Sequence, residues 1–197
     1  MQRFLEDLVK KISKKDFQFR NTTLILPSQR AAVFLKREFA NAHKGSPTWL
    51  PRIITFNEWM SEVSGVAPAD SLELKFAFYD AYKKVYKGDA QGISEVFSWC
   101  DVLIKDFNDL DGHLIDNSKF FKNLSNYTEI EHFSFLKSPL TEKQHRYQRF
   151  WNQIPDLHRA FKAELKKSGL GYPGMIASEV SEKMESFLGN SDGRYVA

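Results

Sequence analysis

The segment 155–166 contains the residue types of a PD-(D/E)xK nuclease motif, in which two acids bind magnesium and a lysine stands beside the attacking water. Asp156, Glu164 and Lys166 fit that pattern. The chemistry requires these side chains to project from adjacent strands. Apolar residues in this segment recur every four positions, however, which predicts a helix with Glu164 and Lys166 spread around its surface. We therefore expect no nuclease activity from this segment.

Acidic residues crowd the stretch 101–116, where a carboxylate metal site is conceivable. Two of them, Asp106 and Asp109, share one face of the predicted helix. The acids alternate with an apolar stripe whose other side must contact water, so a solvated helix end is the alternative interpretation. The stretch contains Asp101, Asp106, Asp109, Asp111 and Asp116.

The other catalytic residue types form no known motif, so we expect no cofactor, metal or catalytic residue in this chain. The histidines lack the spacing HExxH and are expected mostly at the surface. Cys100 lies on an apolar stripe, which predicts a buried thiol. No glycine precedes a lysine and a hydroxyl residue as in GxxxxGK[ST], which argues against ATP hydrolysis. The histidines are His43, His113, His132, His145 and His158.

Polar and basic residues that follow two predicted strands are the remaining candidates for ligand binding. Open parallel sheets bind ligands beyond the carboxyl ends of their strands, and a helix N-terminus there suits a phosphate. A phosphodiester backbone could therefore rest at this edge. The alternative, equally open at this point, is that these are capping and turn residues with arginines facing solvent. The candidate nucleic-acid-binding residues are Ser28, Gln29, Arg30, Arg37, Thr55 and Asn57.

The elements that would position these residues form an α/β unit. After an amphipathic helix at 2–14, a buried strand at 22–26 precedes a helix at 29–42, and a second strand follows at 53–56. This order is typical of a βαβ unit with a parallel sheet. Thr55 and Glu58 fit a capping box, so the second strand should turn directly into a helix.

From residue 71 onward the apolar period is helical. A capping box at Thr141 and Gln144 begins a helix that Pro155 interrupts or kinks, and a final apolar run indicates a strand cut short. We expect an α/β core portion at 1–70, a helical insertion at 71–190 and the start of a truncated strand at 191–197, predominantly helical overall. The helical patterns lie at 74–85, 93–110, 118–124, 129–136, 147–165 and 173–188.

Composition bounds the class of protein. The chain has 197 residues, a net charge of +3 and one cysteine, which excludes an internal disulfide. It has no apolar run of the roughly 20 residues that cross a bilayer, and its first residues lack a secretion signal, so we expect a cytoplasmic protein with no membrane contact. The 17 Phe, 7 Tyr and 4 Trp serve mainly to fill helix interfaces in the core.

Several sequence blocks resemble the AddB-like family, bacterial proteins described as an inactivated superfamily I helicase joined to a PD-(D/E)XK nuclease. The resemblance covers essentially the whole chain. In the first block this chain has Gln29, where family members more often place Asn and a second Arg. The blocks are ILPSQRAAVFLKREF, WLPRIITFNEWMSEVSG, DSLELKFAFYDAYK, SWCDVLIKDFNDLDGHLID, NLSNYTEIEHF and GLGYPGMIASEV.

The resemblance implies a fold and a function. The fold is a degenerate P-loop-helicase-like sheet without a Walker A motif, carrying a helical insertion. The implied function is a non-catalytic role in processing DNA double-strand-break ends. The implied partners are DNA, as duplex ends or a single strand, and an AddA-like helicase–nuclease subunit. A different function is also compatible with the residues: a helical protein–protein interaction module that never contacts DNA.

Overall fold

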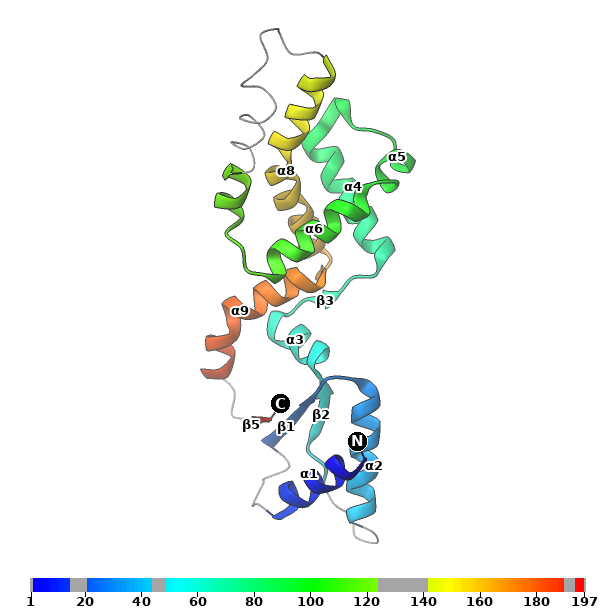
Figure 1. Cartoon of the computed structure of the whole chain (residues 1–197), viewed down its shortest axis with the longest axis vertical. Helices are drawn as coiled ribbons and strands as arrows, with labels where there is room; N and C mark the ends of the chain where they lie inside the picture. The colour runs from blue at the N-terminus through cyan, green and yellow to red at the C-terminus, as the bar shows by residue number, and fades with distance from the viewer. Residues whose placement is uncertain (1, 15–20, 44–48, 124–141, 190–193, 197) are drawn as a thin grey trace. The chain divides into compact units, whose positions relative to one another are not determined.

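The computed structural model describes residues 2–14, 21–43, 49–123, 142–189 and 194–196 (Figure 1). The chain divides into two compact units. Unit 1 comprises Met1–Val63 with Lys183–Ala197, and unit 2 comprises Ser64–Glu182. The protein is predominantly helical, with a small parallel sheet in unit 1.

The sheet of unit 1 has three parallel strands in the order β2-β1-β5. They are β1 (Thr22–Leu26), β2 (Arg52–Thr55) and β5 (Arg194–Val196). Leu24 in the central strand is in register with Ile53 on one side and Val196 on the other. Leu24 and its neighbour Ile25 are both buried although they point to opposite faces of the sheet. The sheet is therefore covered on both faces at β1, as a parallel sheet requires.

Three helices accompany the sheet: α1 (Gln2–Lys14), α2 (Gln29–Ala42) and α3 (Phe56–Ser64). Apolar residues of α1 recur at helical spacing and pack against α2 and β1 in one cluster. This packing fixes α2 beside the sheet and places its N-terminus just beyond the end of β1. The cluster consists of Leu5, Val9, Ile12, Leu24, Leu35 and Phe39.

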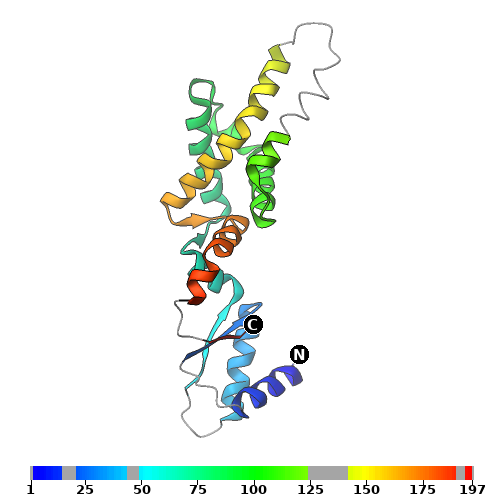
Figure 2. The ribbon, with the colours of Figure 1, turned by 90° about the vertical axis from the view of Figure 1, so that its left-hand side faces the viewer.

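Unit 2 is a helical body whose core is rich in aromatic rings. α4 packs against α8 (Figure 2). Phe78 of α4 lies edge-on to Phe161 of α8, with ring centroids 5.4 Å apart, and also contacts Trp99 and Phe107. Its helices are α4 (Ser71–Tyr86), η2 (Lys87–Asp89), α5 (Ile93–Phe97), α6 (Cys100–Gly112), a short helix over 117–123, α8 (Glu142–Lys167) and the first part of α9 (Pro173–Gly189).

A second, two-stranded parallel sheet joins the beginning and the end of unit 2. It pairs β3 (Ala67–Pro68) with β4 (Leu170–Gly171). The sequence did not predict these strands. A Cβ added at Gly171 would lie 2.8 Å from a methyl carbon of Val66, so the close approach of the two segments requires glycine there.

Several helix boundaries differ from the sequence prediction. The apolar stripe 93–110 is divided between α5 and α6 at Ser98–Trp99. Of the two alternatives for Pro155, an interruption and a kink, the interruption was wrong, because α8 continues through this residue. Ile154 and Leu157 are buried on either side of that proline, so packing offsets the hydrogen bond that proline cannot donate. The predicted helix at 129–136 lies outside the described residues, and so does Thr141 of the expected capping box; its partner Gln144 lies in α8, but nothing is described of its side chain.

Candidate functional site

The predicted site lies at the carboxyl ends of β1 and β2, where α2 and α3 begin. Ser28 is the N-cap of α2, and its hydroxyl oxygen accepts a hydrogen bond from the backbone N–H of Ala31 at 3.3 Å. This bond satisfies one of the free N–H groups of the first helical turn. Ser28 therefore acts as the capping residue that its position predicts.

The carboxylate of Glu58 brings the two strand ends together. The side-chain amide of Gln29 donates to Oε1 at 2.7 Å, and Thr55 donates to Oε2 from its backbone N–H at 2.6 Å and from its hydroxyl at 2.9 Å. The N–H of Glu58 in turn donates to the hydroxyl oxygen of Thr55 at 3.2 Å, which confirms the predicted capping box. The backbone donor of Thr55 is the main reason that the pKa of Glu58 lies below its ordinary value.

This arrangement disfavours phosphate binding by Gln29 and Thr55. Their donors point at a carboxylate that carries the negative charge a phosphate would bring. A phosphate at this edge would have to displace Glu58 and would be repelled by it until it did. The capping interpretation, left open by the sequence, accounts for the side-chain hydrogen bonds of Ser28 and Thr55, while Gln29 links the two strand ends through Glu58.

Arg30, Arg37 and Asn57 are exposed, as Ser28 and Gln29 are, but their side chains take no part in the hydrogen bonds described above. Among the described residues, neither arginine contacts a carboxylate. Arg30 and Arg37 are seven positions apart on α2, so they share one face of the helix, and the exposed apolar side chains of Val33 and Phe34 lie between them. This face of α2 presents two available guanidinium groups in an apolar setting.

Arg52, at the start of β2, already forms an ion pair within the protein. Its guanidinium binds both carboxylate oxygens of Glu62 on α3, with one N···O distance of 3.0 Å. This bidentate geometry holds the side chain along the helix. Arg52 is therefore less available to a ligand than Arg30 or Arg37.

A buried polar network in unit 2 was not predicted. Asp111 at the end of α6 is 3% exposed and His158 in α8 is 2% exposed. Nε2 of His158 lies 3.0 Å from Oδ2 of Asp111 and 3.2 Å from the hydroxyl oxygen of Tyr172, which itself donates to Oδ2. Asn117 donates to Oδ1 at 3.0 Å, and the ammonium group of Lys162 lies 3.1 Å from Oδ2.

The network keeps Asp111 ionised. Burial alone would raise its pKa, but hydrogen bonds from His158, Tyr172 and Asn117 outweigh burial and hold the pKa well below the ordinary value. Burial, with the nearby carboxylate, raises the pKa of the Tyr172 hydroxyl, which stays protonated and donates. Because each partner is buried or occupied, we interpret the network as an anchor that joins α6, α8 and the start of α9.

One sequence signal could have indicated the network. His158 falls on the apolar stripe of α8, between Ile154 and Phe161 at helical spacing, and Asp111 directly follows the buried Leu110. A titratable residue on a core stripe predicts burial with a partner. His158 is therefore a buried exception among the histidines, and the expectation of a solvated helix end was wrong for Asp111.

The charged residues of the nuclease pattern, Asp156, Glu164 and Lys166, each form ion pairs with other partners. Asp156 pairs with Arg159 one turn along α8, while Lys166 pairs with Glu179 on α9. Glu164 is held by lysines on α4 and α8, and these two ion pairs lower its pKa. Within the described ranges, no group of three His, Cys, Asp or Glu side chains is placed to hold a metal ion.

Over the same ranges, no helix has the length and hydropathy to cross a membrane.

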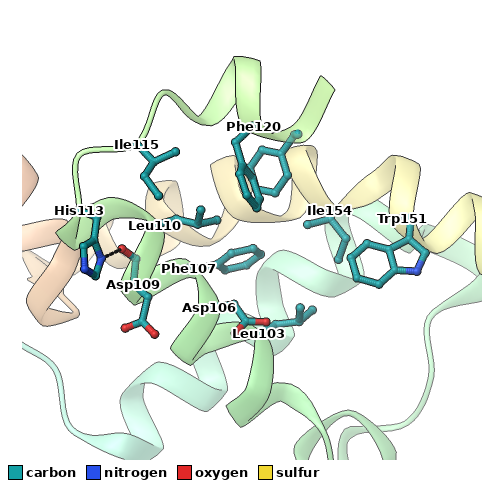
Figure 3. A pocket seen from close by; sticks show the side chains of 11 residues that line it. Leu103, Asp106, Phe107, Asp109, Leu110, His113, Ile115, Phe120, Trp151 and Ile154 are labelled. Atoms are coloured by element: carbon teal, nitrogen blue, oxygen red, sulfur yellow. Dashed lines mark hydrogen bonds between the residues drawn. The ribbon is translucent and has the colours of Figure 1, made fainter. Parts of the chain in front are cut away.

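An apolar cavity of about 370 Å³ lies among α6, α8 and the short helix over 117–123 (Figure 3). Phe107 forms part of its lining from α6, and Ile154 and Trp151 line it from α8. Ile115 and Phe120 lie at its outer part and are 41% and 37% exposed. A second, polar cavity of about 320 Å³ adjoins Asp111 and is lined by side chains of α8 and α9.

Comparison of the chain with protein-family models, with curated proteins and with solved structures gives no match.

Proposed function

We propose that this chain is the non-catalytic, helicase-like N-terminal domain of a protein that processes DNA double-strand-break ends in recombination and repair. Two features support the proposal. The sequence blocks follow the order found in AddB-like proteins, and the parallel sheet β2-β1-β5 resumes after a helical body of more than a hundred residues. A small α/β domain that carries a large helical insertion is what that resemblance implies.

The main support for DNA binding comes from the two arginines on α2 that contact no carboxylate among the described residues. Seven residues of helix span roughly 10 Å along its axis, which is about three phosphate steps of one DNA strand. Arg30 and Arg37 can therefore contact the same backbone, and Phe34 between them offers an aromatic face to an unpaired base. Ser28, Gln29 and Thr55 then serve to hold the N-termini of α2 and α3, while Asn57 remains a candidate contact.

The proposed function also requires a protein partner and a cytoplasmic location. An AddA-like helicase–nuclease subunit would supply the ATP hydrolysis that this chain has no motif for, and both would work on DNA in the cytoplasm. This chain's own part is to bind and organise.

Salt-dependent DNA binding tests the proposal. Fluorescence anisotropy would follow a labelled blunt-ended duplex and a labelled single strand over a salt series, with wild type, Arg30→Ala/Arg37→Ala and Arg52→Ala. Loss of two phosphate contacts should reduce the slope of log K against log salt by about 1.8 for the duplex. Arg52→Ala removes one positive charge, from a side chain that Glu62 already holds, so its slope should match wild type. A double variant with the wild-type slope would exclude Arg30 and Arg37 from the DNA contact.

A second candidate function is a protein–protein interaction module. The apolar cavity of unit 2 favours it, because an open aromatic-lined surface is typical of interfaces. It predicts partner binding without any salt-dependent DNA signal.

A further inference from the structure

The apolar cavity of unit 2 has the form of a groove. Its lining side chains run from His113 and Asp109 at one end to Trp151 at the other (Figure 3). The apolar lining also continues outward onto Ile115 and Phe120, which are partly exposed. An elongated apolar surface that opens to solvent suits a rod-shaped occupant, and an α-helix is the usual one.

One edge of this groove carries uncompensated negative charge. Asp106 and Asp109 lie three positions apart on α6, so both carboxylates border the same side. Neither has a cationic partner in the part of the chain that the structure describes. The neighbouring acids differ: Asp101 pairs with Lys75, and Asp116 pairs with Lys119.

We propose that this groove binds an amphipathic helix of a protein partner, with the helix's apolar face against Phe107 and Ile154 and a lysine or arginine of its edge opposite Asp106 and Asp109. Apolar side chains at positions i, i+3 or i+4, and i+7 of the helix would enter the groove. The two carboxylates would set its orientation and favour basic over acidic helices.

The charges argue against DNA in this place. The residues that line the groove include two aspartates and no lysine or arginine, so a phosphate backbone would meet like charge there. The groove and the arginine face of α2 therefore serve different ligands. Because the inference does not depend on DNA binding, either can fail while the other stands.

A model peptide tests the proposal on the whole chain. The probe is a dye-labelled amphipathic helix of about 18 residues made of leucine and lysine, with leucines at helical spacing, at roughly 0.15 M salt. Two control peptides have glutamate in place of lysine or the same composition in scrambled order. We expect the leucine–lysine helix to bind at least about tenfold more tightly than either control, since the glutamate peptide faces like charges and the scrambled peptide has no apolar face.

Substitutions of residues that line the groove test whether the peptide binds there. Asp106→Lys/Asp109→Lys should weaken binding about tenfold, and Ile115→Lys should weaken it similarly by placing a charge in the apolar surface. Glu95→Lys on α5 reverses one acidic charge at an exposed residue that does not line the groove, and this variant should bind like wild type. Circular dichroism would establish that each variant is folded.

The outcomes that would overturn the proposal are distinct. Equal binding of the scrambled and helical peptides, or binding that survives all groove variants, would show attachment elsewhere. Absence of peptide binding in the folded wild type would show that the groove takes no basic helix, and binding of a small apolar dye alone would make it a small-molecule cavity.

Discussion

Replacing Asp111 with asparagine should destabilise unit 2 by about 3 kcal/mol. Breaking a buried, hydrogen-bonded ion pair costs about 3–5 kcal/mol, because the remaining groups stay buried without their counter-charge. The lower end applies here for two reasons. Asparagine keeps the shape and one acceptor oxygen, and Lys162 is about a quarter exposed and can turn to water.

Urea unfolding followed by circular dichroism would measure the loss, and hydrogen exchange would locate it in unit 2. Asp106→Asn on the same helix is the matched control, since Asp106 is exposed and should change the unfolding free energy by less than about 0.5 kcal/mol. The reasoning is refuted if Asp111→Asn costs less than about 1 kcal/mol.

The pH dependence of the same variant gives a second test. The pKa of Asp111 is lower in the folded protein than its ordinary value of 3.8. The carboxylate therefore contributes its full stability above that ordinary value, and the contribution is lost as the pH falls toward the lower folded pKa. The difference in unfolding free energy between wild type and Asp111→Asn should stay large at neutral pH and shrink below about pH 4.

Three further predictions concern single residues. Glu58→Gln should lower the melting temperature at pH 7, and the difference from wild type should shrink in acid, because the lowered pKa of Glu58 means that its contribution is present above 4.5 and lost below it. Gly174→Ala should cost about 1–3 kcal/mol in urea unfolding, since its Cβ would lie 2.0 Å from the carbonyl oxygen of Asn108, whereas Gly189→Ala meets nothing within 4 Å and should be nearly neutral. Cys100 is buried, which also raises the pKa of its thiol, so it should react with a thiol reagent only after unfolding.

Local signals in the sequence were sufficient to predict the first strand and the helix that follows it in the α/β part of the fold. The strand at 22–26 and the helix at 29–42 agree with β1 and α2, because Pro27 ends the strand and Ser28 caps the helix. The capping box of Thr55 and Glu58 was readable for the same reason, since its partners are three residues apart.

Contacts between distant residues could not be predicted in this way. Gln29 meets Glu58 across 29 positions, and Asp111 meets Tyr172 across 61, and no period or motif links such pairs. The strands β3 and β4 have two residues each, which is too short for an alternating pattern. The candidate site was thus located by its strand ends, whereas the hydrogen bond from Gln29 to Glu58, which joins the two ends, required the fold.

The central position of β1 has a consequence for protein synthesis. One edge of β1 pairs with β2 soon after both leave the ribosome, but the other edge waits for β5, which is made after all of unit 2. Unit 2 is one continuous stretch and can fold during that interval. Until β5 arrives, β1 exposes an unpaired strand edge to other nascent chains. Translation speed through unit 2 therefore sets how long this chain is vulnerable to aggregation.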